Sequence, residues 1–454
     1  MEAFLVFFLT LLFIFVLGYL RKLPLFVILI LGGIFCGLLA GAGPDSTFLW
    51  VASGMGSMFA GFAIAILSGV AIVRLLADQE LLDVMIEGIR SKVRNTLASS
   101  GILAFVLAVP ITCPVVTYAM LSPVLKRLEP EKVRANMLLY AAATCGIVSY
   151  ILVFPTPVTQ PLVTAFAPNA FGGVFDLVTI PVAVCLLVFV LLLWSWRGRS
   201  YRKTLPADPS PASGVVAGPD TAGPGEYPTD ASGQAIPLSR HLKAWAPFIA
   251  IVASIPVGHF LLGLSHVAIL QFIMLVGLVV ALFLAPQEIR ITSFSAGVKT
   301  AGMVLFDICA AGAIGTVMVK SGLAKSALTT LIPVLPDIVI PFIIAAILAT
   351  AQGSRVVTAV VSAQVIGATA LIHEINPLPM ILMVAAGSCF LCHITDPFFQ
   401  LIRKTTGDTT RAVLKGYTLP LACVGIVLFV VALVLVVLVF PYHEDAALAM
   451  IPQA

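Results

Sequence analysis

Long apolar segments recur along almost the whole of this sequence, and most are long enough to cross a lipid bilayer. A membrane-spanning helix needs about 20 consecutive, mostly apolar residues. Hydrophobic residues make up 60% of the 454 positions and charged residues only 10%, and the mean hydropathy is +1.11. Because only helices and closed barrels satisfy every backbone polar group within lipid, the sequence predicts an all-α polytopic membrane protein.

The expected helices cover apolar runs near 3–20, 24–42, 48–76, 134–167, 174–196, 244–263, 266–285, 298–319, 378–402 and 416–441. Two further apolar stretches, 98–125 and 330–372, contain polar breaks. We expect each of these to form a re-entrant hairpin, which enters and leaves the membrane on the same side.

A flexible linker is expected between two membrane-embedded halves. Residues 197–240 are rich in Pro, Gly, Ser, Asp and Thr, a composition that cannot bury a core. The halves on either side, 1–196 and 241–454, match each other when shifted by roughly 240 residues, and each would cross the membrane about five times. An odd number of crossings gives the halves opposite orientations. The sequence therefore predicts two inverted repeats, each with a re-entrant hairpin and a broken helix.

The basic residues predict the orientation of the chain. Lys and Arg are concentrated in the cytoplasmic loops of membrane proteins. Most of the Lys and Arg residues in this sequence fall on one side of the membrane if both hairpins turn back. That side is therefore the cytoplasm, and the linker lies there. The net charge of +4 is modest and does not indicate nucleic-acid binding. The eight cysteines all lie in apolar stretches, so we expect core residues and no disulfide framework.

The stretch Gly387–Phe399 places ionisable side chains at membrane depth, where they are costly and usually functional. Pro397 directly follows Asp396, so the helix is expected to break there. Asp396 and His393 are candidates for ion coupling, because a buried carboxylate and an imidazole can exchange protons near neutral pH. Thr395 is a candidate substrate ligand. The alternative is that Asp396 and His393 form a mutually satisfied structural pair.

The second hairpin carries four candidate substrate-binding residues at its tip: Gln352, Gly353, Ser354 and Arg355. Gly353 permits a tight turn, and the polar side chains offer hydrogen bonds. A half-helix that starts at this tip would direct its positive end at an anion, and Arg355 can bind a carboxylate with two parallel hydrogen bonds. The alternative is that Arg355 reaches the interface or pairs with Asp307 or Asp396.

The first hairpin and its neighbouring helix contain proline breaks. Pro110 and Pro114 cannot both lie in a continuous helix without freeing backbone carbonyls. Thr112 lies between them and is a candidate substrate ligand, although a simple kinked helix remains the alternative. Residues 155–157 read Pro-Thr-Pro, and Thr156 is a candidate ligand for a hydroxyl-rich molecule or a cation. The alternative here is a kink with hydroxyl-to-backbone hydrogen bonds.

Two further features of the sequence are a single acidic residue in an apolar run and a cysteine-containing pattern. Asp307 lies in an apolar run and is a further candidate for ion coupling, with a structural hydrogen bond as the alternative. Residues 389–393 match the haem-attachment pattern C-x-x-C-H, but they lie inside an expected membrane helix. We therefore expect no haem, no other cofactor and no metal. A phosphate-binding loop, a nucleophile elbow and a zinc-protease motif are all missing from the sequence, so we do not expect an enzyme.

Together these positions resemble the gluconate permease (GntP) family, within the wider ion transporter superfamily. The residues that carry the resemblance are Ala351–Ser354, His393–Asp396, Leu152–Pro157 and Ala311–Gly322. The resemblance implies a proton symporter for gluconate or related sugar acids in the bacterial inner membrane, with the hairpins and broken helices forming the site and with a homodimeric assembly. Arg355 departs from the family pattern, where a small residue is expected, and favours a ligand with more carboxylate charge.

The sequence thus predicts a secondary active transporter that imports a small organic anion, a sugar acid or hydroxycarboxylate, together with protons. Two alternatives within transport stay open: a sodium-coupled di- or tricarboxylate symporter and a sodium/proton antiporter. A different class, an anion channel, would give flux without concentrating its substrate. The expected partners are the anion, the coupled proton or sodium ion and the lipid bilayer.

Overall fold

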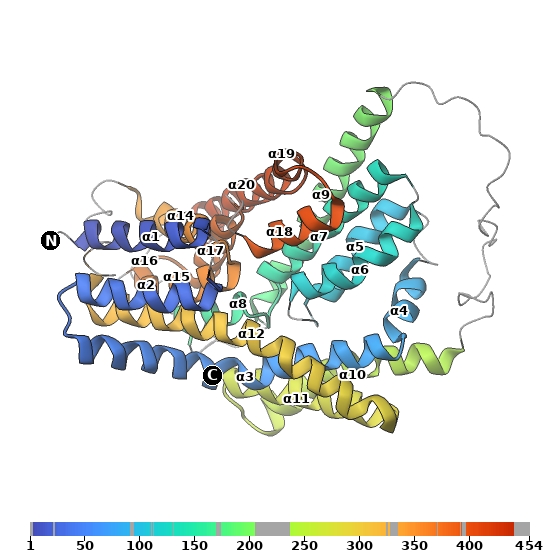
Figure 1. Cartoon of the computed structure of the whole chain (residues 1–454), viewed down its shortest axis with the longest axis horizontal. Coiled ribbons are helices and arrows are strands. Elements are labelled where there is room, and N and C mark those ends of the chain that lie inside the picture. Colours follow the sequence, from blue (N-terminus) through green and yellow to red (C-terminus); the bar gives the residue numbers. More distant parts are fainter. Residues whose placement is uncertain are drawn as a thin grey trace.

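The computed structural model describes most of the chain. The described residues are 3–20, 23–90, 95–109, 111, 113–129, 131–168, 174–204, 237–323, 326, 335–369, 371–390, 392 and 396–439. Regular structure in these ranges is helical throughout (Figure 1).

The chain is built from helices both before and after the expected linker. The first half contains α1 (Ala3–Leu20), α2 (Leu25–Leu39), α3 (Pro44–Asp78), α4 (Leu81–Arg90), α5 (Thr96–Ala108), α6 (Pro114–Leu128), α7 (Lys132–Leu152), α8 (Thr159–Phe166) and α9 (Asp176–Thr204). The second half contains α10 (Leu238–Pro256), η2 (Val257–Leu261), α11 (His266–Leu284), α12 (Gln287–Lys320), η3 (Asp337–Val339), α14 (Ile340–Gln352), α15 (Arg355–Gly367), α16 (Leu371–Glu374), α17 (Pro377–Phe390), α18 (Pro397–Thr406), α19 (Thr410–Val413), η4 (Leu414–Thr418), α20 (Leu419–Val434) and η5 (Leu435–Val439).

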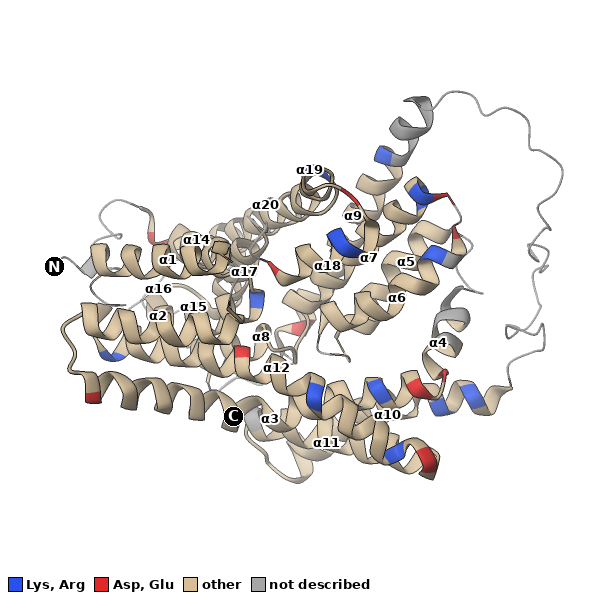
Figure 2. Cartoon of the chain, viewed as in Figure 1, with Lys and Arg blue, Asp and Glu red and all other residues tan. Residues whose placement is uncertain are grey.

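Several of these helices are suited to a bilayer. Within the described residues, six are long and apolar enough to cross a membrane: Pro44–Asp78, Lys132–Leu152, Asp176–Arg197, Leu238–Leu261, Gln287–Lys320 and Thr410–Val439. Shorter apolar helices, among them α1, α2 and α11, accompany them. The prediction of an all-helical polytopic membrane protein is confirmed, with six candidate membrane-spanning helices among the described residues. Figure 2 shows long stretches of ribbon without charge, including α1, α2 and α20, and most of the charged residues at helix ends.

The two longest described helices, α3 and α12, pack against each other and run together along the lower side of the fold in Figure 1. Small residues allow their backbones to approach closely, as is common between membrane helices. A Cβ added to Gly54 would lie 2.4 Å from the carbonyl oxygen of Gly312, and one added to Gly297 would lie 2.8 Å from the Cα of Ala71. Since residue numbers rise along one helix as they fall along the other, α3 and α12 are antiparallel.

Each expected hairpin corresponds to a pair of short helices that pack on each other, α5 with α6 and α14 with α15. Each expected break is also present. The first lies between α7 and α8, where Leu152 ends one helix and Thr159 begins the next. The second lies between α17 and α18, where Phe390 ends one helix and Pro397 begins the next. The prolines at these positions explain both interruptions, since a proline lacks the backbone donor that a helix interior requires.

The expected linker lies mostly outside the described residues. Helix α9 continues to Thr204 and α10 begins at Leu238, so the ends of the range 197–240 are helical. The division of the chain at this linker stays a prediction.

Candidate functional site

The tip of the second hairpin is a tight turn between two half-helices. Gln352 ends α14, and Gly353 follows in the left-handed conformation, with φ 67° and ψ 19°. Its N–H donates to the carbonyl oxygen of Ala349 at 2.8 Å, which closes the helix end. Ser354 then caps α15, since its Oγ accepts the N–H of Val357 at 3.4 Å. The glycine and the capping serine together place Arg355 at the first position of a new helix.

Arg355 is buried, and its guanidinium donates hydrogen bonds to three acceptors. Its Nη1 lies 3.3 Å from Oδ2 of Asp396, and its Nη2 donates to Oη of Tyr417 at 2.7 Å and to Sγ of Cys392 at 2.9 Å. The side chain of Arg355 is only 7% exposed. Its Nε has no hydrogen-bond partner among the described residues. The pairing with Asp396 is one of the alternatives that the sequence left open for this arginine.

Asp396 occupies the break between α17 and α18. It caps α18, because its Oδ1 accepts the N–H of Phe398 at 2.8 Å, while Oδ2 faces Arg355. The residue is 3% exposed. A buried charge must be paired and hydrogen-bonded to be tolerated. Asp396 and Arg355 meet that requirement together, across 41 positions of sequence.

Two buried glutamine side chains have no hydrogen-bond partner in the part of the chain that the structure describes. Gln352 and Gln160 are each 2% exposed, and neither the oxygen nor the nitrogen of either amide has a hydrogen-bond partner among the described residues. Gln160 lies on α8, which packs against α15 and α17. An unsatisfied buried polar group costs about 1–3 kcal/mol. Such groups are commonly satisfied by water or by a ligand.

A row of aromatic rings begins beside the guanidinium. The Cζ of Arg355 lies 5.9 Å from the ring centre of Tyr417, within reach of a cation–π interaction. Phe398 meets the Tyr417 ring edge-on at 5.6 Å, and Tyr118 of α6 meets Phe398 edge-on at 5.3 Å. Both halves of the chain therefore contribute to one buried cluster around Arg355.

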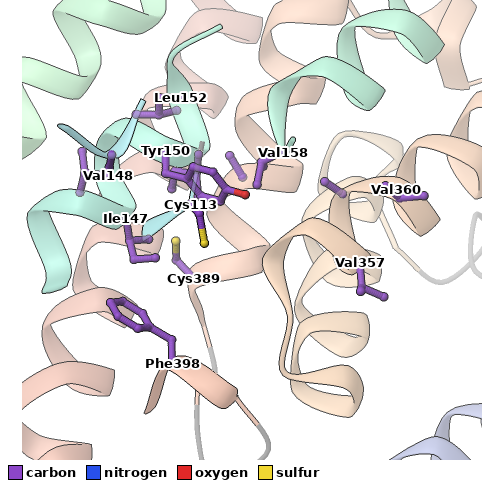
Figure 3. Close-up of a cluster of buried hydrophobic side chains, with 14 of the residues drawn as sticks. Cys113, Ile147, Val148, Tyr150, Leu152, Val158, Val357, Val360, Cys389 and Phe398 are labelled. Carbon is purple, nitrogen blue, oxygen red and sulfur yellow. The ribbon is translucent and has the colours of Figure 1, made fainter. Parts of the chain in front are cut away.

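Figure 3 shows how the first hairpin reaches this cluster. Cys113, which precedes α6, belongs to the same buried cluster as Cys389 of α17 and Tyr150 of α7. Phe398 is on the opposite side of the same cluster. The tips and breaks of the two halves thus converge on one place.

The backbone groups at the first break are satisfied by nearby side chains. Thr156 is buried, and its Oγ1 donates to the carbonyl oxygen of Tyr150 at 2.8 Å and accepts the N–H of Thr159 at 3.2 Å. Asp176, at the start of α9, accepts the N–H of Phe154 at 2.9 Å. This arrangement matches the alternative of local hydroxyl-to-backbone bonds that was left open for Thr156.

The structure brings some of the predicted site residues together and separates others. Gln352, Gly353, Ser354 and Arg355 share one turn, and Asp396 joins them through Arg355. Asp307 is half-buried on α12 and faces the backbone N–H of Phe26 at the start of α2 instead. Three further candidates lie outside the described residues: Thr112, His393 and Thr395.

The sequence reasoning missed two residues of the cluster around Arg355. Tyr417 follows Lys415-Gly416 near the start of an apolar run, but nothing in the sequence indicates that it faces Arg355. Cys392 was interpreted as a core residue and as part of a haem-attachment pattern that was set aside. In the part of the chain that is described, no three His, Cys, Asp or Glu side chains are grouped so that they could hold a metal ion.

Comparison with known proteins agrees with a membrane transporter. The model of the GntP family permeases matches residues 249–439. An uncharacterized permease of Haemophilus influenzae is 29% identical over 150 residues, which cover 32% of this chain and 30% of that protein. A solved structure of Neisseria gonorrhoeae MtrF, from a study of a class of antimetabolite efflux pumps, is similar in fold. Its TM-score is 0.56 at 14% identity, and the match covers 93% of this chain and 97% of that one.

Proposed function

We propose that this chain, whose resemblance to the GntP family permeases is confirmed over residues 249–439, is a secondary active transporter that imports a small organic anion with protons. The permease match indicates a transporter and not an enzyme. The substrate class that we propose is a gluconate-like sugar acid or a hydroxycarboxylate. The observation that carries the proposal is the buried pair of Arg355 and Asp396, together with Gln352 on the same turn as Arg355, whose amide has no hydrogen-bond partner among the described residues.

Arg355 supplies the positive charge for the anion. A guanidinium binds a carboxylate through two parallel hydrogen bonds. Here the Nη1 is occupied by Asp396, while the Nε has no partner among the described residues. Nε shares an edge of the guanidinium with Nη2, whereas Nη1 and Nη2 form its outer edge. An incoming carboxylate that binds the Nη1–Nη2 edge therefore competes directly with Asp396 for Nη1.

This competition provides a mechanism of proton coupling. When the substrate displaces Asp396, the aspartate would remain as an unpaired charge in a buried site, which is unfavourable. Binding one proton to Asp396 removes that charge. Substrate and proton then bind together and leave together, which is the requirement for symport. His393 remains a further proposed coupling residue. For Asp307, which faces the backbone N–H of Phe26, we propose the structural alternative.

The polar groups around Arg355 suit the hydroxyls of a sugar acid. An amide offers two donors and one acceptor oxygen, so the side chain of Gln352 can both donate to and accept from hydroxyl groups. Gly353 and Ser354 bring the backbone of the same turn close to the ligand. We propose that Thr112, Thr156 and Thr395 complete the substrate site.

We further propose that the halves 1–196 and 241–454 are inverted repeats joined by a cytoplasmic linker. The antiparallel packing of α3 and α12 supports this, because these helices hold the same place in the order of each half. Alternating access then comes from movement of the hairpin units against the remaining helices. We expect the protein in the bacterial inner membrane, as a homodimer.

The proposal is tested by uptake into proteoliposomes that contain the purified protein. Labelled gluconate is offered with an imposed inward proton gradient and, separately, with an inward sodium gradient. Accumulation above equilibrium with protons alone is the expected result. Entry that stops at equilibrium under both gradients would indicate a channel and would refute active transport. Failure to take up gluconate would require a panel of di- and tricarboxylates, in view of Arg355.

Sodium coupling is a second candidate, and one observation favours it. Oxygen atoms gather at the first break, where Thr159 Oγ1 lies 3.1 Å from Thr156 Oγ1 and 3.3 Å from the carbonyl oxygen of Val153. Sodium is held by oxygen ligands of this kind. These oxygens already form hydrogen bonds with one another, so we propose protons ahead of sodium as the coupling ion. Accumulation of the anion with sodium alone would favour sodium instead.

A further inference from the structure

A short π-helical turn, η4 (Leu414–Thr418), lies directly against the Arg355 site. Tyr417 accepts the hydrogen bond of Arg355 Nη2 at 2.7 Å. The next residue, Thr418, donates from Oγ1 to the carbonyl oxygen of Cys392, at the start of the second break. The inner side of η4 is therefore bound both to the hairpin tip and to the broken helix. Single π turns inside helices are frequent at functional sites.

The residues of η4 just before Tyr417 are held by the first half of the chain. Gly416 packs closely on Tyr140 of α7, since an added Cβ would lie 2.8 Å from the ring. The Oη of Tyr140 donates to Oδ2 of Asp408 at 2.7 Å. Arg197 of α9 donates to the carbonyl oxygen of Lys415 at 3.0 Å. Three consecutive residues thus connect these contacts to the buried guanidinium.

The partners of η4 in the first half are themselves held in place by packing. The ring of Tyr140 stacks on Trp194 with an angle of 3° and a centre distance of 5.8 Å. The guanidinium of Arg197 lies 5.4 Å from the centre of the Trp194 ring. Nearby, Asn136 Nδ2 donates to the carbonyl oxygen of Thr406 at 3.2 Å. Helices α7 and α9 together hold the segment between α18 and η4.

We propose that Tyr140, Asp408 and Arg197 form a latch, defined by the Tyr140–Asp408 and Arg197–Lys415 hydrogen bonds, which holds Tyr417 on Arg355 while it is closed. When the latch opens, η4 moves away from α7 and Tyr417 leaves the guanidinium, so the site becomes accessible from that side. Tyr417 is a positioning residue in this scheme. The inference rests on the proposed transport function, because it assumes that the two halves move relative to each other during transport.

The latch has a matched control elsewhere in the chain. Ser293 Oγ of α12 donates to Oδ2 of Asp78 at the end of α3, also at 2.7 Å and also between the two halves. This hydrogen bond has the same kind of acceptor as the Tyr140–Asp408 bond, but neither residue belongs to η4 or to its partners. Ser293→Ala therefore removes an equivalent contact without opening the latch.

The test measures access to Cys392, which is 4% exposed and accepts a hydrogen bond from Arg355. The full-length protein in detergent is treated with N-ethylmaleimide, and labelling at Cys392 is followed by mass spectrometry. A hydrogen bond to a charged group contributes roughly tenfold to an equilibrium at the low end of its range. We expect Tyr140→Phe and Asp408→Asn each to label about tenfold faster than the unmodified chain, with no change in the control variant.

Unchanged labelling in both latch variants would overturn the inference. An equal rise in Ser293→Ala, or a rise that follows the fall in Tm across all the variants, would also overturn it, because general loosening would then explain the result. The labelling requires neither substrate nor gradient. Faster labelling without proton-driven uptake would leave the latch standing and refute the proposed coupling, whereas proton-driven uptake with unchanged labelling would refute only the latch.

Discussion

Replacing Asp396 by Asn is the most informative change to the proposed site, because it removes one charge and leaves the shape almost unchanged. Asp396 and Arg355 are both buried, and their charged atoms lie 3.3 Å apart. In Asp396→Asn the guanidinium would stay buried without a counter-charge. Removal of one partner from a buried pair costs about 3–5 kcal/mol.

The geometry gives a similar magnitude. Two unit charges separated by 3.3 Å attract by about 5 kcal/mol at an effective dielectric constant of ~20. Arg355 keeps its hydrogen bonds to Tyr417 and Cys392 in the variant, so we take the low end, about 3 kcal/mol. For a chain of 454 residues, an unfolding entropy of ~2.1 cal/mol/K per residue converts this loss to a fall in Tm of about 3 °C.

The assay is a thermal double-mutant cycle on the detergent-purified protein. The four chains are the unmodified protein, Asp396→Asn, Arg355→Gln and the double variant. Each single variant leaves one buried charge unpaired, and the double variant leaves none. We therefore expect the double variant to recover most of the Tm that either single variant loses. If the double variant loses the sum of the two single losses, within about 0.5 kcal/mol, the two side chains are not coupled and the reasoning is refuted.

Three further variants test other parts of the account. Gln352→Leu removes a buried amide that has no hydrogen-bond partner among the described residues, so Tm should rise by about 1–3 °C while the KM for the anion rises at least about tenfold; a lower Tm would show that the amide is satisfied in the protein. Gly353→Ala places a Cβ at positive φ and should cost about 1–2 kcal/mol, and an unchanged Tm would contradict the left-handed turn. Gly387→Ala would bring a Cβ to 2.4 Å from the carbonyl oxygen of Phe342, so it should lower Tm by about 1–3 °C through overpacking of α14 on α17; no loss of stability would argue against that crossing. Asp307→Asn should keep proton-driven accumulation, since this residue faces the start of α2, and its loss would make Asp307 a coupling residue.

The sequence predicted much of the fold because hydropathy and proline act locally. Apolar length is enough to locate the helices, and the prolines around Thr156 and after Asp396 locate both breaks. The tight turn at Gly353 followed from its conformational freedom. Helix ends were predicted less well, since α9 and α10 extend into the range assigned to the linker.

The candidate site was predicted only in part, because its contacts join distant parts of the chain. The tip residues Gln352 to Arg355 and the carboxylate of Asp396 were identified as polar groups within apolar segments. Their pairing was one alternative among several, since sequence spacing does not determine which helices meet. Tyr417 and Cys392 lie near Arg355 only through packing between α15, the second break and η4, and no local pattern encodes that packing.

The central claim is that exchange of partners at Arg355 couples anion binding to protonation of Asp396. The most direct measurement compares two activities of Asp396→Asn in proteoliposomes: exchange of labelled for unlabelled anion at equal pH, and accumulation driven by an inward proton gradient. We predict that exchange persists, because Arg355 remains available to the anion, and that accumulation above equilibrium is lost. Proton-driven accumulation that survives in this variant would contradict the account.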